Sequence, residues 1–468
     1  FDLKNGISGD ADAAIRGSQF YLGDDTGLVN SFVDTTAKNG FTYYYAVTAY
    51  DHGERGATAP SECSKIITLD QKGHIVLKGT NVVGVKPEAR PAGYTEAAIE
   101  NFTAGITNTT TGQVNYDIID ERLLQDGSTY RIKFTDTLFK KAPIGLTRAT
   151  TSYSLVNLTS GDTLLNKSET FKPGSIVPMT EGFRLSFRSD SLLEYDKKNS
   201  GWNRPNIFTI KVAAFAYQKI VGLLQPHDYR IQFGELGVDT STCFTKGTRE
   251  YPAKPVNFKI FNIASDEPIE FGFIEQDGND GVFSAYTESK RSDQIIFLEK
   301  NKADSLVPSF IFHCNSFSEQ DSTAGHPAAG DIFTIKTLKP FLSHDAFEFT
   351  TKAHYIDNMM AANQIDRIRV VPNPYIVTNS WEPKNLYLSG RGERQLHFIH
   401  LPQSCTIRIF TIRGNLVREI RHRSHILDGT YIWDMLTKDQ LDIAYGIYIY
   451  HVDAGELGQK IGKFAVIK

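Results

Sequence analysis

The sequence predicts an all-β protein built of tandem antiparallel β-sandwiches. Segments in which polar and apolar residues alternate recur along the chain, and this period of two is typical of strands. Phe (30) and Tyr (21) far outnumber Met (4), a balance that favours strands over helices. A short helix is expected at residues 356–365. A chain of 468 residues is too long for one core and should divide into several domains.

The last hundred residues show the clearest pattern. Residues 405–412 alternate polar and apolar side chains, Arg413-Gly414-Asn415 interrupts them, and the pattern resumes over 416–420. Gly414 supplies the positive φ that a tight hairpin turn requires. The sequence therefore predicts that 365–468 form a small antiparallel sandwich. We expect this domain to bury three residues together: Ile407, Ile409 and Trp433.

Several motifs follow one another in this region. Pro-Asn-Pro precedes the hairpin, and Trp-Asp, Tyr-Gly-Ile-Tyr-Ile-Tyr and a terminal Lys-Phe-x-Val-Ile-Lys follow it. The ordered series resembles the C-terminal sorting domain of proteins exported by the type IX (Por) secretion system. Its middle is also similar to the Ig-like domain of flagellar hook-capping proteins. The motif residues are Pro372, Asn373, Pro374, Gly414, Trp433, Gly446, Lys463 and Lys468.

The resemblance implies passage across the outer membrane and a life outside the cell, with the last strands read by the secretion machinery. Sorting domains of this family are often removed after export. Because the chain still carries its domain to Lys468, we expect either that removal did not occur or that the domain has become a permanent part.

Near the N-terminus, residues 40–51 form a tyrosine-rich strand that is followed by Gly53, Gly56 and Pro60. This stretch resembles the F strand and F-to-G turn of a fibronectin type III domain. The resemblance covers two or three strands, so residues 1–70 are interpreted as a partial domain. Its missing strands must come from upstream sequence, a neighbouring domain or another chain.

An internal repeat organises the middle of the chain. Three segments return in the same order: Tyr130–Phe134 as Tyr229–Phe233, Tyr153–Asp162 as Phe258–Glu267, and Ile207–Lys211 as Ile332–Lys336. The repeat predicts two related β-sandwich units, while chance similarity between alternating strands is the alternative. The expected divisions are a Gly-, Ala- and Thr-rich linker at 71–111, units at 112–220 and 221–352, and a second linker at 353–364.

Composition excludes several classes of protein. No apolar run is long enough for a transmembrane segment, and the net charge of -4 gives no indication of nucleic-acid binding. A basic group runs from Arg413 to His425, where charges on a hairpin edge are the favoured interpretation. The four cysteines lie far apart in no metal-ligand spacing, and a bridge between Cys243 and Cys314 is not expected.

The sequence contains no Gly-x-Ser-x-Gly, His-Glu-x-x-His or Walker motif, so we predict that the protein is not an enzyme. His397 and His400 lie three positions apart in a predicted strand, which places them on opposite faces and makes them poor partners for one metal. No catalytic residue and no cofactor is predicted, apart from a candidate Ca²⁺ site. Its ligands would be Asp277, Asn279 and Asp280, although a plain Asx-Gly turn explains the same residues.

A further candidate is O-glycosylation. Bacteria with this export system commonly glycosylate Asp-Ser/Thr followed by an aliphatic residue or Thr, and glycans there would shield strand edges. The candidate acceptors are Thr35, Thr137, Thr163, Ser191, Ser305 and Ser322.

The preferred functional hypothesis is a non-enzymatic secreted protein of the cell surface, a fibre or a matrix. Its partners would be the secretion machinery and other protein subunits, and it would reside outside the outer membrane. Two alternatives stay open: the accessory tail of an exported hydrolase whose catalytic domain lies upstream, and a carbohydrate-binding adhesin. The adhesin would use three exposed aromatic residues: Trp202, Trp381 and Tyr387.

Overall fold

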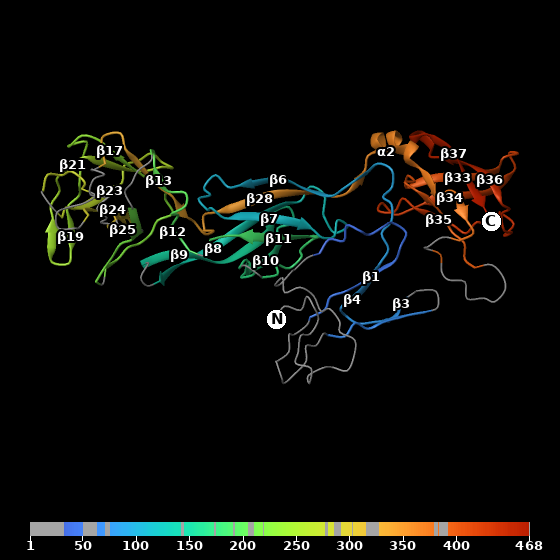
Figure 1. Ribbon diagram of the computed structural model, residues 1–468, viewed down its shortest axis with the longest axis horizontal. Coiled ribbons are helices and arrows are strands. Elements are labelled where there is room, and N and C mark those ends of the chain that lie inside the picture. The colour runs from blue at the N-terminus through green and yellow to red at the C-terminus, as the bar shows by residue number, and fades with distance from the viewer. Residues whose placement is uncertain are drawn as a thin grey trace, which may run out of the picture. The chain divides into compact units, whose positions relative to one another are not determined.

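The computed structural model is almost entirely β, which confirms the prediction of an all-β protein with antiparallel sandwiches (Figure 1). It divides into two compact units, one of residues 97–353 and one of residues 1–96 together with 354–468. The structure describes residues 32–49, 63–70, 75–141, 145–172, 175–190, 192–204, 210–218, 220–276, 279–284, 292–301, 303–314, 327–378, 382 and 392–467.

The larger unit contains a first sandwich, with a five-stranded sheet in the order β10-β9-β8-β28-β6 and the strand pair β11-β7. Apolar side chains from both layers, among them Tyr130, Leu185 and Phe349, share one buried cluster. The Tyr130 ring stacks on Phe349 with centroids 5.1 Å apart. The strands are β6 (Ala98–Ala104), β7 (Gln113–Ile118), β8 (Thr129–Lys141), β9 (Gly145–Asn157), β10 (Thr163–Ser168), β11 (Phe183–Arg188) and β28 (Ala346–Lys352).

A second sandwich in the same unit has two four-stranded sheets, β13-β26-β17-β22 and β14-β25-β24-β23. Phenylalanines from both sheets fill its core, including Phe258, Phe297 and Phe312. Its main strands are β13 (Gly201–Trp202), β14 (Ile210–Ala214), β17 (Tyr229–Phe233), β22 (Phe258–Asn262), β23 (Glu270–Ile274), β24 (Gln294–Lys300), β25 (Leu306–Cys314) and β26 (Ile332–Ile335).

Short strand pairs complete the larger unit. They are β12 (Glu194–Tyr195) with β27 (Thr337–Leu338), β15 (Ala216–Tyr217) with β16 (Ile220–Val221), β18 (Asp239–Thr240) with β21 (Pro255–Val256), and β19 (Phe244–Lys246) with β20 (Arg249–Tyr251).

The second sandwich is inserted into the first. Strand β28, at residues 346–352, pairs with both β8 and β6. It therefore belongs to the first sandwich, although it follows all strands of the second sandwich in the sequence. The predicted units at 112–220 and 221–352 are therefore wrong in their boundaries, because β13 and β14 belong to the second sandwich and β28 to the first. Alternation identifies a strand but does not reveal which distant strand it pairs with.

The internal repeat is confirmed for its first two segments. Tyr130 pairs with Asn157 in the β8–β9 ladder, and Tyr229 pairs with Asn262 at the equivalent place of the β17–β22 ladder. The next strand of each sheet also corresponds. Strand β28 pairs with β8 on the side opposite β9, and β26 pairs with β17 on the side opposite β22. The third match fails, because Ile210 begins β14 in the opposite sheet and the counterpart of β26 is β28.

The asparagine that ends each repeated ladder builds the same turn twice. The Asn157 carboxamide oxygen accepts the Thr159 N–H at 3.0 Å, and that of Asn262 accepts the Ala264 N–H at 2.9 Å. In both turns the residue four positions later has a positive φ: Gly161 at 84° and Asp266 at 57°. Asn and Asp side chains stabilise such turns by binding their own backbone, which explains their recurrence.

Each copy also buries a tyrosine whose hydroxyl donates to a glutamate from another strand or loop. The Tyr130 hydroxyl lies 2.5 Å from Glu181 Oε2, and the fully buried Tyr229 hydroxyl donates to Glu299, which also contacts His227 Nδ1 at 2.7 Å. Burial, reinforced by Glu181, raises the pKa of Tyr130 to about 12. Each tyrosine therefore remains a hydrogen-bond donor inside the core.

Polar contacts fix the two sandwiches to each other. The Lys339 ammonium donates to Asp228 at 2.6 Å, while the Lys339 backbone N–H donates to Thr111 of the first sandwich at 2.8 Å. Burial tends to raise the pKa of Asp228, but the Lys339 and Lys336 ammonium groups outweigh it and the pKa is lowered. The ionised carboxylate thus holds both lysines at the junction.

The smaller unit combines short N-terminal strand pairs with a C-terminal sandwich. Its sheets in that sandwich have the orders β30-β32-β35 and β31-β37-β36-β33-β34. Its elements are β1 (Tyr43–Ala46), β2 (Ile67–Leu69), β3 (Ile75–Lys78), β4 (Val82–Val85), β5 (Tyr94–Thr95), β29 (Tyr355–Ile356), α2 (Asn358–Gln364), the 3₁₀ turn η2 (Ile365–Arg367), β30 (Arg369–Val371), β31 (Tyr375–Ile376), β32 (Leu396–Ile399), β33 (Ser404–Thr411), β34 (Leu416–Arg423), β35 (Tyr431–Trp433), β36 (Gly446–Asp453), η3 (Gly455–Leu457) and β37 (Gln459–Ile467).

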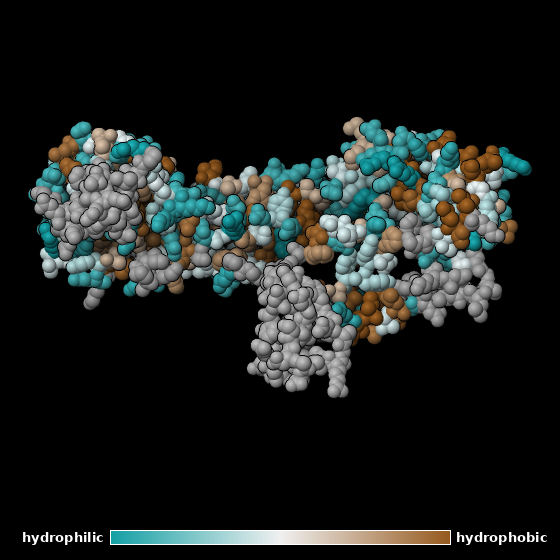
Figure 2. All heavy atoms as spheres, viewed as in Figure 1, coloured by the Kyte–Doolittle hydropathy of each residue, from teal (hydrophilic) through white to brown (hydrophobic). Residues whose placement is uncertain are grey.

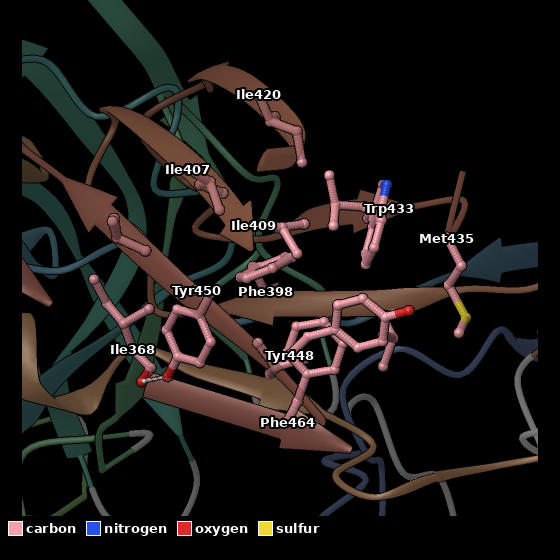
Figure 3. Close-up of a cluster of buried hydrophobic side chains, with 14 of the residues drawn as sticks. Ile368, Phe398, Ile407, Ile409, Ile420, Trp433, Met435, Tyr448, Tyr450 and Phe464 are labelled. Atoms are coloured by element: carbon pink, nitrogen blue, oxygen red, sulfur yellow. Dashed lines mark hydrogen bonds between the residues drawn. The ribbon is translucent and has the colours of Figure 1, made fainter. Parts of the chain in front are cut away.

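The core of the C-terminal sandwich confirms the expected burial of Ile407, Ile409 and Trp433, each at most 1% exposed. Figure 3 shows these side chains converging with Phe398 and Tyr450 from both sheets. The predicted hairpin is also confirmed, because β33 and β34 are joined by a turn in which Gly414 has a φ of 82°. The helix expected near 356–365 is α2.

Residues 71–111 are not a linker: the described residues there contain β3, β4, β5 and β6, and Ala89 and Ala92 are at most 3% exposed. Small residues that pack closely have the same composition as a linker, which explains the error. The tyrosine-rich strand is confirmed as β1, where Tyr43 and Tyr45 stack at 6.3 Å. Much of the proposed fibronectin-like segment, including 1–31 and 50–62, lies outside the described residues.

We expect Tyr229→Phe to destabilise the second sandwich by about 1–3 kcal/mol, because it leaves the buried Glu299 carboxylate without its hydroxyl donor. Hydrogen exchange of β17 and β22 amides in increasing urea measures this loss. Tyr251→Phe is the matched control, since that half-buried hydroxyl makes no hydrogen bond with a described residue. Equal effects of the two substitutions would contradict the assigned role.

Candidate functional site

The Pro-Asn-Pro motif binds the chain's terminal strand. The Asn373 side chain donates from Nδ2 to the Lys463 carbonyl at 3.0 Å and accepts at Oδ1 from the Ala465 N–H at 3.2 Å. A carboxamide presents one donor and one acceptor in the manner of a peptide group, so Asn373 takes the place of a neighbouring strand. Pro372 and Pro374 flank it, each preceded by a cis peptide bond.

Strand β31 continues this pairing along β37. Tyr375 and Ile376 pair in parallel with Val466 and Ile467, and the Val377 N–H donates to the Ile467 carbonyl at 3.1 Å. On its other side β37 pairs with β36 along its whole length. The terminal strand therefore lies inside a five-stranded sheet, covered on one side by the motif and on the other by β36.

Three of the remaining motif residues, Trp433, Gly446 and Lys463, lie on or beside the same strand. Trp433 is buried and donates from Nε1 to the Leu436 carbonyl at 3.1 Å, and its ring meets Phe464 of β37 edge-on at 6.2 Å. Gly446 opens β36 opposite Val466, with a φ of 150°. Lys463 is exposed and supplies the carbonyl that Asn373 binds. Gly414 lies in the β33–β34 turn, and Lys468 lies outside the described residues.

Sequence reasoning did not identify Gly462, which lies under the ring of Tyr450. The two residues pair across β36 and β37, and a Cβ at Gly462 would come within 2.3 Å of the Tyr450 ring. The tyrosine hydroxyl donates across the sandwich to the Ile368 carbonyl at 3.3 Å (Figure 3). A glycine inside an aromatic-rich strand indicates such a close approach and was available in the sequence.

The outer face of β36 and β37 is partly apolar (Figure 2). Tyr448 and Tyr450 point into the core, so Ile447 alternates outward and is 55% exposed. On β37, Ile461 and Ile467 are exposed by the same alternation, at 68% and 46%. We call Ile447, Ile461, Lys463 and Ile467 the terminal face.

The basic group predicted between Arg413 and His425 lies largely on β34, the edge strand of this sheet. Arg421 is exposed, whereas His422 alternates inward and is 5% exposed. Burial lowers the pKa of His422, so this residue adds no positive charge to the surface at neutral pH. The interpretation as a charged strand edge agrees with these positions.

His397 is 3% exposed, and burial lowers its pKa to about 4. His400 follows the end of β32 with a φ of 59° and is partly buried. Among the described residues there is no group of three or more His, Cys, Asp or Glu side chains that could hold a metal ion. Cys243 is a free thiol.

In the loop of the predicted Ca²⁺ site, described oxygen atoms already bind protein groups. Asn279 Oδ1 accepts from the Lys254 ammonium at 2.9 Å, and Asp280 Oδ1 accepts from the Val282 N–H at 2.8 Å. Lys254 also pairs with Glu275, so its ammonium group connects this carboxylate to Asn279. Asp277 lies outside the described residues, and the calcium site stays a prediction.

The same loop is held by a buried carboxylate. Asp293 is fully buried and accepts N–H groups of Gln276 and Ser284, each at 2.7 Å. Burial raises the pKa of Asp293 to about 7, with Glu275 and Asp280 acting in the same direction and the two N–H donors against it. This carboxyl group therefore titrates near neutral pH.

Four of the predicted glycan acceptors are exposed: Thr35, Thr137, Thr163 and Ser305. Ser191 and Ser322 lie outside the described residues, as do Trp381 and Tyr387. Trp202 is partly buried and packs against Phe233 and Phe333 at 5.7 and 5.1 Å. The Trp202 ring is therefore a core side chain and a poor sugar platform.

No helix in the described part of the chain has the length and apolar character needed to cross a membrane. No protein-family model matches the chain, and no curated protein sequence does either.

Several solved structures show a weak similarity, among them the following three. PorZ, an essential surface component of the type IX secretion system of Porphyromonas gingivalis, is 12% identical over 78% of this chain and 58% of its own, with a TM-score of 0.18. Dimeric latent PorU from the same organism is 9% identical over 74% and 30%, with a TM-score of 0.15. The adhesin domain of Epf from Streptococcus pyogenes is 11% identical over 79% and 98%, with a TM-score of 0.15.

The chain thus spans little more than half of PorZ and under a third of PorU. TM-scores this low establish no common arrangement, so the function proposed below rests on the chain's own residues.

Asn373→Ala should loosen the terminal strand by about 1–2 kcal/mol, because the Ala465 N–H and the Lys463 carbonyl both lose their partner. Hydrogen exchange at residues 463–467 measures the effect. Asn415→Ala, an exposed asparagine in the same domain whose side chain makes no described hydrogen bond, provides the control. Unchanged exchange in Asn373→Ala would show that the motif does not hold the strand.

The raised pKa of Asp293 predicts a pH dependence of stability. Because the pKa of Asp293 in the folded state, about 7, lies above 3.8, the ordinary pKa of an aspartate, the unfolding free energy of the second sandwich is expected to fall by about 2–3 kcal/mol between pH 5 and 8. Asp293→Asn should remove this component, while exposed Asp304→Asn should retain it. Hydrogen exchange of β24 amides in urea at both pH values measures the unfolding free energy. An equal pH dependence of this free energy in wild type and Asp293→Asn would refute the assignment.

Proposed function

We propose that the chain is a non-enzymatic surface protein, exported through a type IX-like system by its C-terminal sandwich. The observation that carries the proposal is that several of the motif residues, distant in sequence, meet at strand β37. Asn373 binds the backbone of β37, and Trp433 packs on Phe464 of the same strand. These motif residues thus have a shared structural task, because together they hold β37 in place.

The terminal face is the surface that the secretion machinery would contact. Its apolar residues are solvent-exposed although they lie beside a well-packed core, and exposed apolar groups of this kind are typical of binding surfaces. Lys463 adds a positive charge beside Ile447 and Ile461. The proposed contact is therefore with an apolar protein surface that carries acidic residues.

The β-sandwiches would act as a spacer or structural part at the outer-membrane surface. Two nested sandwiches joined through Asp228, Lys339 and Thr111 give an extended β unit suited to such a role. Glycosylation at Thr35, Thr137, Thr163 and Ser305 belongs to the same proposal, supported by their exposure. Self-association into a fibre and attachment to an upstream hydrolase are further hypotheses that the same export route would serve.

Export of the full-length chain in a host with a type IX system tests the proposal. The double variant Ile447→Asp/Ile461→Asp should reduce the surface-exposed fraction several-fold, because it places two charges on an apolar contact without altering the core. The fraction is measured by protease accessibility on intact cells, beside total amount from lysed cells.

Ile432→Asp is the matched control, since Ile432 is 38% exposed on β35, in the opposite sheet from β36 and β37. Wild-type chain that stays inside the cell, or a double variant exported as well as this control, would defeat the proposal.

A further inference from the structure

We infer that the C-terminal sandwich is a permanently held part of the protein. Residues 87–95, which precede both nested sandwiches in the sequence, bind it through their backbone. We call residues 87–95 the docking segment. The inference deepens the proposed function: it concerns the fate of the domain that the proposed export would use. Where sorting domains are detachable, this one would remain attached even after the chain that leads into it is cut.

The docking segment contacts two loops of the C-terminal sandwich through its backbone. The Gly429 N–H donates to the Ala89 carbonyl at 2.8 Å, and the Ala92 N–H donates to the Leu401 carbonyl at 3.2 Å. Leu401 and Gly429 are themselves joined by a hydrogen bond of 2.9 Å. The segment therefore adds to a backbone network as a strand added at an edge does.

It also fixes the start of helix α2. The Gly93 carbonyl accepts the N–H of Asp357, the N-cap residue, at 2.8 Å, and the Gly93 N–H donates to Gln364 Oε1 at 2.9 Å. Immediately beyond, β5 pairs with β29, with Thr95 opposite Tyr355. Contacts thus reach three separate places of the domain: the paired loops, the helix and the strand that leads into it.

The interface is closely packed. Ala89 is 3% and Ala92 1% exposed. A Cβ at Gly429 would lie 2.6 Å from the Arg90 carbonyl oxygen, and one at Gly93 would lie 2.4 Å from the Asp357 carbonyl oxygen, where the φ of +79° already disfavours a side chain. Such close backbone approach leaves no room for a side chain and indicates a closely fitted contact.

The experiment places a recognition site for a sequence-specific protease between Ala353 and His354 of the full-length chain. Cleavage then yields fragments 1–353 and 354–468, which no peptide bond joins. We expect the two fragments to co-elute in size-exclusion chromatography at the position of the uncut protein and to separate only in denaturant. Separation of the wild-type fragments under native conditions overturns the inference.

Gly429→Val and Gly93→Val in the same cleavable chain test the docking segment itself. Each should release the C-terminal fragment after cleavage, because the added side chain collides with backbone. Gly201→Val is the matched control, since nothing lies within 4 Å of a Cβ there and the complex should persist. Co-elution retained in both glycine variants would show that other contacts hold the domain, and would equally refute the assignment.

Hydrogen exchange on the uncut variants guards against a folding defect. Amides of β33 and β36 should keep their wild-type protection, while those of Leu401 and Gly429 lose it. If a variant loses protection throughout the domain, it is misfolded, and the inference is then judged by whether the cleaved wild-type fragments co-elute. The export assay is independent of this result, because the fragments can remain together in a protein that is not exported, and an exported protein can release its domain.

Discussion

The backbone hydrogen bonds between β28 and its two neighbours, β8 and β6, hold the larger unit together. Strand β28 inserts between them at the end of the unit and turns two separate parts of a sheet into one. Its side chains Phe347 and Phe349 complete the aromatic cluster around Tyr130. The second sandwich depends on this pairing for its position, because the chain enters it after β11 and leaves it toward β28.

The C-terminal sandwich follows the same principle with a different device. Asn373 supplies donor and acceptor groups from a side chain, and the docking segment supplies them from backbone laid down much earlier in the chain. In both units, therefore, a core is completed by residues that are distant in sequence. Closing such long loops costs conformational entropy, which the burial of several aromatic or small apolar residues offsets.

Local features of the fold could be predicted from the sequence. Alternation and Gly414 located the β33–β34 hairpin, and the recurrence of Tyr130–Phe134 at Tyr229–Phe233 located two equivalent strands with the same register. The limits came from pairing over long distances. The amino-acid sequence of β28 does not distinguish it from a strand of the second sandwich. The docking segment contains Ala and Gly residues, a composition that is also typical of a linker. The hydrogen-bond partners of Asn373 could not be predicted either, because a sequence motif identifies recurring residues but not the groups that they contact.

The docking segment has a consequence for synthesis. Residues 87–95 are made long before Gln364 and Gly429, so their backbone groups stay without these partners until the C-terminal sandwich has been translated. A prematurely terminated chain would keep this stretch bare, with its small apolar residues open to proteases and chaperones. Quality control could thus recognise a chain that lacks the C-terminal sandwich by this exposed segment, and translation of the sandwich would cover it.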